Sequence, residues 1–555
     1  WRHHQSGCRN LQFNLNSYNI NVAVSLQGAG MDQTIINGSI YYSLNNATTE
    51  DIRVSGMTIQ SWAGNTARNQ ALCWSNGSGM LTNSTITVEN CKIVDFLYGI
   101  GVNSNTSNCT LDVKNVTFEN VFCGANIPIG GSQANHLGDW SSVSGNAVYQ
   151  YQLFGSENDP YTPNDYYDEN GTPTDSSDVK VPTFDKGNWP AVAVVNGEYY
   201  GDLQDAIAAG GTVALVDDVE LESKLVIDAA KVTLNLDGHT ISAADGFAPD
   251  NSHLVEVLAN GVTIENGTLK SSASNRHTLN IWSNEAGKTA TLKNLVIDHA
   301  AAASNEGAPL VVNAYDVTVE GKLTLTTGET SWYAMNLECG YGNACVSFAN
   351  GSTLEIQGPA TTGIKIENSI DTDNTVNAVE VDLENATVTA DNVVYLIETN
   401  AENTDSIFNV TPSKNVVKVG NNYVFTDDVV ATVDGQNFLS LQEAVDAADK
   451  GNGIIELQKD IDGVTVNVPA GADITVNGNG HTLTLAAGAT GVFNGVASDN
   501  TEGLQSDTSL MVNNVNFKGA SDSQTGHAVI TGLNASGVNV TLSGCTFENL
   551  HDAVY

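Results

Sequence analysis

The stretch that decides the fold reads ITVENCKI at residues 86–93 and returns as LDVKNVTF at residues 111–118. Both copies have the form apolar–x–apolar–x–Asn–x–x–apolar, and their asparagines, Asn90 and Asn115, are 25 residues apart. The pattern recurs around Asn266, Asn294, Asn385 and Asn514, and with glycine at the same place around Gly56, Gly321 and Gly544. A unit repeated at this period is typical of stacked structural repeats and not of a conventional globular core.

Each copy of the pattern predicts a strand, a sharp bend and a second strand. Apolar residues two positions apart point to one face of a strand, and Asn and Gly tolerate a left-handed backbone at low cost. Stacking would place equivalent strands side by side in parallel and form a ladder of asparagine side chains. The predicted ladder residues are Asn90, Asn115, Asn266, Asn294, Asn385 and Asn514. The alternative, an antiparallel sandwich, needs Asn-Gly hairpins at regular spacing, which the sequence lacks.

The sequence resembles right-handed parallel β-helix proteins of the pectate-lyase-like class. The resemblance is carried by the Asn bends and by LQGAGMDQTII (26–36), NLDGHTI (235–241) and VNGNGHTL (476–483), and it covers most of residues 20–150 and 190–555. It implies an all-β fold of tandem right-handed parallel β-helices forming a solenoid. It says little about function, because lyases, hydrolases, tail spikes and adhesins all use this fold.

A longer repeat predicts where each β-helix begins. Residues 192–221 match residues 430–461, and each copy opens with a strand and a short amphipathic helix. Such a helix would cover the unpaired edges of a first coil. The helices' apolar positions, at i, i+3 and i+4, are Leu203, Ala206 and Ile207 in one copy and Leu441, Ala444 and Val445 in the other.

This repeat gives the predicted domains. Residues 1–150 would be the C-terminal part of a first β-helix, and 151–189 a linker or excursion rich in Pro, Asp and Tyr. Residues 190–425 would be a second β-helix and 426–555 a third, truncated one. We therefore expect the chain to be a fragment of a longer precursor.

The amino-acid composition limits which partners and which cellular compartment are expected. The 555 residues carry 63 acidic and 21 basic side chains, for a net charge of −42. Nucleic acid is not expected as a partner, because phosphate binding needs clustered Lys and Arg. The absence of a long apolar run predicts no membrane insertion within this fragment. We expect an extracellular or cell-surface protein of a prokaryote, kept soluble by self-repulsion.

Catalytic signatures are weak. The resemblance implies that polyuronate-cleaving relatives use one of two catalytic sets: an Arg base with acidic calcium ligands, or an Asp cluster with His and a basic pair. Neither set is recognisable among the five arginines and the acidic residues of this sequence. His239 and His481, equivalent in the longer repeat, are interpreted as turn histidines because a lone His is not a mechanism. No catalytic residue and no cofactor other than calcium is predicted, and a non-enzymatic role is favoured.

Three groups of residues remain as candidate sites. Asp371, Asp373 and Asn374 offer hard oxygen ligands for calcium, with a polar turn as the alternative. Cys339 and Cys345 flank a short loop and are a candidate disulfide, with two thiols as the alternative. Aromatic residues outside the strand period are candidate glycan-binding residues, with loop packing as the alternative: Trp140, Tyr149, Tyr151, Trp332, Tyr333 and Tyr341.

The function predicted from these features is adhesin-like. The chain would be an extended acidic rod that presents loops to glycans or to host and cell surfaces. One alternative is a carbohydrate-active enzyme, a polysaccharide lyase or glycosidase, which a cluster of acids on one outer face would favour. Another is a structural filament or sheath subunit that associates end to end.

Overall fold

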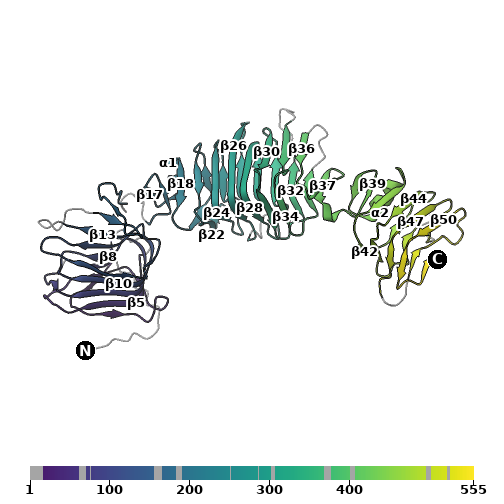
Figure 1. The fold of residues 1–555 in the computed structure, drawn as a ribbon. Coiled ribbons are helices and arrows are strands. Elements are labelled where there is room, and N and C mark those ends of the chain that lie inside the picture. Colours follow the sequence, from purple (N-terminus) through teal and green to yellow (C-terminus); the bar gives the residue numbers. More distant parts are fainter. Residues whose placement is uncertain are drawn as a thin grey trace. The chain divides into compact units, whose positions relative to one another are not determined.

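The computed structural model shows a chain built mostly of β-strands (Figure 1). It describes residues 17–61, 70–75, 77–155, 165–182, 190–249, 252–285, 287–301, 307–367, 377–399, 407–495, 502–521 and 526–555. The chain divides into two compact units. The first comprises Trp1–Leu221, Leu225–Ser242 and Val262–Thr268, and the second comprises Glu222–Lys224, Ala243–Gly261 and Leu269–Tyr555.

The N-terminal part of the first unit is a set of parallel strands in register. Its main strands are β1 (Ser17–Ile20), β4 (Ser39–Tyr42), β5 (Ile52–Gln60), β6 (Gln70–Trp74), β8 (Thr85–Val102), β10 (Thr110–Pro128) and β13 (Tyr149–Phe154). β8 pairs with β10 in parallel, from Thr85 opposite Thr110 onward, at the predicted shift of 25 residues. Ile86, Val88, Cys91 and Ile93 are fully buried in the core that these strands enclose.

The bends of β8 and β10 lie where the sequence places them. Asn90 and Asn115 have left-handed backbones, with φ of 51° and 50°. The side chains stack, because Asn115 Nδ2 donates a hydrogen bond of 2.7 Å to Asn90 Oδ1. Two further ladders at the same 25-residue spacing were not predicted: Asn108 donates to Asn83, and Asn120 donates to Asp95. Side-chain hydrogen bonds at the 25-residue spacing therefore join three pairs of equivalent positions in this part of the chain.

The other predicted ladder positions divide into two groups. Asn266, Asn294 and Asn514 have left-handed backbones, and Asn266 Nδ2 donates to Asn235 Oδ1 over 3.1 Å. A Cβ atom added to Gly321 would lie only 2.1 Å from Asn294 Oδ1, so a side chain there would displace this asparagine and also strain a backbone with φ of 66°. Asn385 differs, because it lies in a turn and is not among the residues with positive φ. The chain leaves β33 (Ala378–Asp382) by a turn there and does not bend within one strand.

We expect Asn115→Val to lower the free energy of unfolding by about 2 kcal/mol, since it removes the ladder bond and strains a left-handed backbone. Asn115→Gly is the matched control, because glycine keeps the backbone and loses only the bond. That variant should cost about 1 kcal/mol. Urea unfolding of both variants measures the difference. Equal losses for valine and glycine would show that the backbone conformation is unimportant.

The remainder of the first unit begins with a hairpin and a short helix. β16 (Ala193–Val195) pairs antiparallel with β17 (Glu198–Tyr200) and with β18 (Thr212–Leu215). From β18 onward pairing is parallel, to β21 (Thr233–Asn235) and then to residues of β24 (Val262–Lys270). Helix α1 (Leu203–Ala209) buries Leu203, Ala206 and Ile207, as predicted, and the side chain of Asp202 caps its N-terminus.

Two long parallel sheets form the first part of the second unit. One contains β26 (Lys288–Asp298), β28 (Tyr315–Thr326), β30 (Ala344–Phe348), β33 and β36 (Ile407–Thr411), of which β26, β28 and β30 lie side by side in Figure 1. The other runs β23 (Val255–Val257), β25 (His277–Trp282), β27 (Ala308–Asn313), β29 (Met335–Glu338), β32 (Thr362–Glu367) and β35 (Tyr395–Thr399). It ends in antiparallel β38 (Asn422–Phe425) and β37 (Val416–Val419).

In the C-terminal part of the second unit the chain visits three sheets in rotation. The first sheet contains β41 (Ile454–Leu457), β44 (Asp473–Asn477), β47 (Ser509–Asn513) and β50 (Asn539–Ser543). The second contains β42 (Ile461–Val464), β45 (Thr482–Leu485), β48 (Asn516–Lys518) and β51 (Thr546–Glu548). The third contains β43 (Val466–Asn467), β46 (Gly491–Asn494), β49 (His527–Val529) and β52 (Asp552–Val554). All these neighbours pair in parallel.

Helix α2 (Leu441–Ala448) repeats the design of α1 in the second unit. Leu441, Ala444 and Val445 are buried, and Ser440 caps the N-terminus. Each helix also carries a glutamine that closes a strand edge. Gln442 bonds through its amide to both the N–H and the carbonyl of Asn467, and Gln204 bonds likewise to Val226. Neither helix is long or apolar enough to cross a membrane, and the same holds for every helix in the described ranges.

Candidate functional site

The richest cluster of polar side chains lies on the outer side of the sheet that runs from β23 to β35. Residues that alternate with the buried apolar ones form two rows across these strands. In the first row, Glu256, Asn280, Val311, Asn336, Lys365 and Glu398 are successive register partners. In the second row the partners are Trp282, Asn313, Glu338 and Glu367. We call these ten residues the polar face.

The two ends of the first row are ion pairs. At one end Lys224 Nζ lies 2.5 Å from Glu256 Oε2, and Trp282 Nε1 donates to Glu256 Oε1 over 3.0 Å. Burial would raise the pKa of Glu256, but the hydrogen bonds from Lys224 and Trp282 outweigh it and lower the pKa. At the other end, Lys365 Nζ lies 2.6 Å from Glu398 Oε1. Both carboxylates are therefore held ionised and in place.

The middle of the polar face brings two glutamates together on neighbouring strands. Glu338 of β29 and Glu367 of β32 are register partners, so their backbones lie about 4.8 Å apart. Each carboxylate accepts an amide hydrogen bond, Glu338 from Asn313 (3.2 Å) and Glu367 from Asn336 (3.0 Å). Tyr333 lies close by: burial, and then the charges of Glu367 and Glu338, raise the pKa of its hydroxyl. This is a paired set of carboxylates, which the sequence analysis did not find.

Three of the aromatic residues predicted to bind glycan lie against the polar face. Tyr333 is buried and packs on Val311 of the first row. Trp332, which is 47% exposed, contacts Tyr333 with ring centroids 6.0 Å apart. Tyr341, which is 54% exposed, contacts Trp282 of the second row at 6.2 Å. Exposed rings thus stand beside recessed carboxylates and amides, an arrangement that can stack on a sugar and bond its hydroxyl groups.

The other three aromatic residues predicted to bind glycan lie in the first unit, where their rings pack against one another and against core residues. Trp140 stacks near Phe118, at 6.2 Å, and meets Tyr151 edge to face at 5.4 Å. Tyr151 stacks on Tyr167, and Tyr149 packs against Phe122. Because their rings face protein neighbours, loop packing, the alternative kept open for these residues, describes Trp140, Tyr149 and Tyr151 best.

Two further sequence predictions have different outcomes. The calcium candidates Asp371, Asp373 and Asn374 lie outside the described residues. The candidate disulfide between Cys339 and Cys345 is not formed, since both residues are thiols in the structure. Cys339 follows β29, and its sulfur faces the carbonyl oxygens of Glu367 and Asn377 and not the side chain of Cys345 in β30. Burial raises the pKa of both thiols to about 11.

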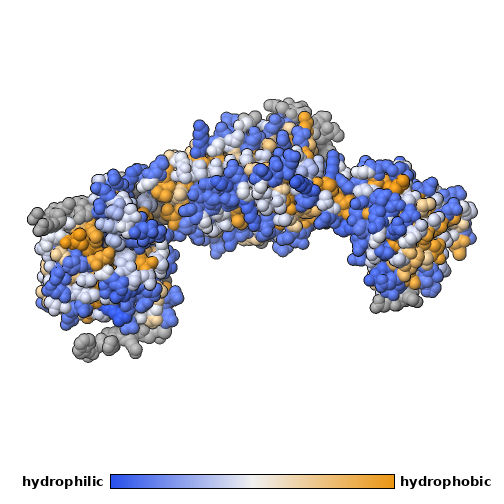
Figure 2. All heavy atoms as spheres, in the orientation of Figure 1, coloured by the Kyte–Doolittle hydropathy of each residue, from blue (hydrophilic) through white to orange (hydrophobic). Residues whose placement is uncertain are grey.

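The face of the molecule shown in Figure 2 is mainly hydrophilic, with hydrophobic residues gathered in patches. Known proteins offer little further guidance. No protein-family model matches the chain, and no curated protein matches its sequence. Among solved structures, a variant of sacteLam55A from Streptomyces sp. SirexAA-E in complex with glucose aligns at 10% identity, covering 96% of this chain and 84% of that chain, with a TM-score of 0.11. So low a TM-score supports no conclusion about fold or activity.

Proposed function

We propose that the chain is an extracellular protein built from tandem right-handed parallel β-helices that binds carbohydrate on its polar face. The β-helix is supported by the rotation of the chain through parallel sheets and by the stacked asparagines at its corners. Two helix-capped starts support tandem helices with the predicted boundaries at 190 and 426. The net charge of −42 suits a surface-exposed, adhesin-like role.

The single observation that carries the binding proposal is the polar face with its aromatic rim. Carbohydrates present hydroxyl groups that need paired donors and acceptors, together with apolar ring faces that stack on aromatics. Glu256, Asn280 and Asn336 are recessed, each no more than 8% exposed, whereas Lys365 and Glu398 of the same row are half-buried. Neutral or basic sugars fit best, because carboxylates outnumber ammonium groups among these residues.

A second candidate function, glycoside hydrolysis, is favoured by one specific feature. Retaining glycosidases use two carboxyl groups about 5–5.5 Å apart, one as nucleophile and one as acid. Glu338 and Glu367 extend from neighbouring strands about 4.8 Å apart, a backbone spacing that allows their carboxyl groups to approach this separation. Tyr333 would supply a hydroxyl beside the pair. A cluster of acids on one outer face was expected to favour an enzyme over a binding protein.

Binding should be measured on a glycan array and then by calorimetry with the best ligand. We expect Trp332→Ala and Tyr341→Ala to weaken binding about tenfold each, or 1.4 kcal/mol, through lost stacking. Phe547→Ala is the matched control. Phe547 is 43% exposed, much as Trp332 is at 47%, but it belongs to β51 and not to the polar face. Equal binding by all three variants would place the ligand elsewhere.

Release of reducing ends from the bound polymer separates the two functions. Binding without release supports the adhesin-like role. Release that is abolished by Glu338→Gln or Glu367→Gln would establish the hydrolase and refute a purely binding role. Neither binding nor release would leave a structural rod or filament subunit as the best account.

A further inference from the structure

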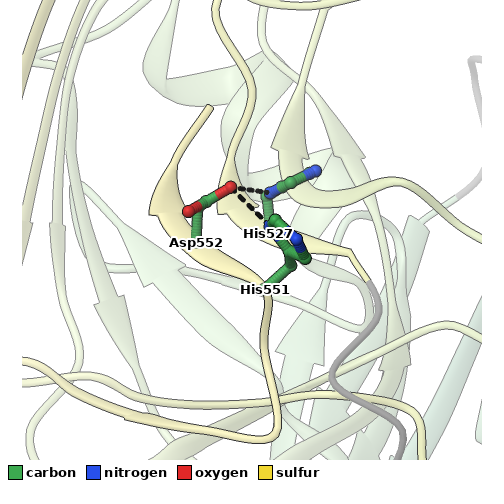
Figure 3. Close-up of side chains that lie close together, drawn as sticks. All are labelled: His527, His551 and Asp552. Atoms are coloured by element: carbon green, nitrogen blue, oxygen red, sulfur yellow. Dashed lines mark hydrogen bonds and ion pairs between the residues drawn. The ribbon is translucent and has the colours of Figure 1, made fainter.

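Two histidines and an aspartate meet where β49 and β52 run side by side in the second unit (Figure 3). His527 and Asp552 are register partners on these strands, so their side chains leave the sheet as neighbours. His551 comes immediately before β52, and its backbone N–H bonds to the carbonyl of Gly526, just before β49. The three side chains are therefore positioned by strand pairing and not by a loop alone.

The donor atoms of these side chains converge on a small volume. Nδ1 of His551 lies 2.7 Å, and Nδ1 of His527 3.4 Å, from the same oxygen, Asp552 Oδ2. One ligand atom from each residue lies within 4.8 Å of the other two. In a tetrahedral site with bonds of about 2.0–2.1 Å, ligand atoms are about 3.3 Å apart. Small rotations would bring the three donors to that spacing.

His527 carries an unexplained polar atom. Its Nδ1 is buried and has no hydrogen-bond partner among the described residues. Its nearest polar neighbour is Asp552 Oδ2, 3.4 Å away, a contact too long to satisfy a buried nitrogen fully. The ring itself is held in place, because it stacks on Tyr555 with centroids 4.5 Å apart and an interplanar angle of 18°. The nitrogen is thus fixed in direction and faces the Asp552 carboxylate.

The positions equivalent to His551 and Asp552 carry apolar side chains in the first unit. The sequence FENVFC at 118–123 aligns with FENLHD at 547–552, so His551 and Asp552 correspond to Phe122 and Cys123. Phe122 and Cys123 are buried in an apolar cluster. His551, by contrast, has a side chain 67% exposed. Apolar packing accounts for Phe122 and Cys123 but not for the imidazole and the carboxylate at the equivalent positions.

We propose that His527, His551 and Asp552 bind a divalent transition-metal ion of the Zn²⁺ type. Two imidazole nitrogens and one carboxylate suit zinc and its neighbours, whereas calcium and magnesium prefer oxygen ligands alone. Three protein ligands leave one tetrahedral position for water or for a ligand atom. The proposed ion would satisfy His527 Nδ1 and replace the hydrogen bond between His551 and Asp552.

The test is calorimetry with ZnCl₂ alone, on the full chain carrying His3→Ala and His4→Ala so that the N-terminal histidine pair cannot compete. One ion per chain should bind, and His551→Ala and Asp552→Asn should each weaken binding at least tenfold. His551 is exposed, so its variant should keep the fold, which far-UV circular dichroism checks. His481→Ala is the matched control, because His481 lies 3.2 Å from Asp460 and belongs to no three-ligand group among the residues that the structure describes. It should bind as the parent does.

The absorption spectrum of bound Co²⁺ gives a second readout. Intense visible bands typical of four-coordinate cobalt, absent in His551→Ala, would support the site. Zinc affinity unchanged in both His551→Ala and Asp552→Asn would overturn the proposal. So would calcium binding as tightly as zinc, or zinc binding lost equally in His481→Ala.

Discussion

Leu441→Asp should lower the free energy of unfolding by about 4 kcal/mol and make the protein self-associate. Leu441 lies on the buried side of helix α2 and is 2% exposed, so the change removes the transfer energy of a buried leucine and places a carboxylate against apolar side chains. The helix should detach and release the amide of Gln442 from the backbone of Asn467. A strand edge with open N–H and C=O groups is a template for another chain.

Denaturant unfolding and light scattering at several concentrations would measure the two effects of Leu441→Asp. Glu443→Asp places the same residue on the exposed side of the same helix and should change neither quantity. Gln442→Ala is intermediate, because it opens the edge without removing buried apolar surface, and it should cost about 1–2 kcal/mol. A Leu441→Asp protein that remains monomeric and as stable as its parent would show that α2 does not protect the edge.

Glu256→Ala should lower the free energy of unfolding by about 3 kcal/mol, the lower end of the range for breaking a buried ion pair. The lower end applies because the Lys224 side chain is 31% exposed and its ammonium can reach water. The change also leaves Trp282 Nε1 without its acceptor. Glu256→Gln retains an acceptor for Trp282 and should cost less. Lys224→Met combined with Glu256→Met should be more stable than Glu256→Ala, since no charge is left unpaired.

The same ion pair predicts a pH dependence. Because the pKa of Glu256 is lowered on folding, its contribution is present above its unfolded value of about 4.3 and is lost as the pH falls through the folded value. Parent and Glu256→Ala proteins should therefore differ in stability at pH 7, and the difference should shrink as the pH falls below about 4.3 and through the folded pKa. A difference that persists in acid would indicate packing and not charge.

Some features of this molecule could be predicted because they depend on short-range rules. The apolar alternation and the Asn bends depend on neighbouring residues only, and the helices at Leu203 and Leu441 follow from local amphipathicity. Asn385 was misjudged because the same letters also suit an ordinary turn. The glutamine contacts of the helices join residues 22 and 25 positions apart and need the packed structure to be seen.

The polar face escaped prediction for a geometric reason. Its rows unite residues at unequal distances along the chain, from 24 residues between Glu256 and Asn280 to 33 between Lys365 and Glu398. A repeat of constant length in the sequence therefore does not bring the residues of these rows into alignment. Glu338 and Glu367 become partners only when the register of β29 and β32 is known. The triad of His527, His551 and Asp552 likewise needs the pairing of β49 with β52.

The position of the capping helices has a consequence for how the protein is made. Gln442 precedes the strand edge that it closes by 25 residues, which a ribosome adds in about 1–5 s. Helix α2 is thus synthesised before the strand edge that its Gln442 closes. Each later strand can then pair with a strand that its own chain has already formed. New strands are therefore expected to add to the sheets in one direction only, from the N-terminal side toward the C-terminal side. Neighbouring nascent chains on one messenger then find no starting edge with which to pair.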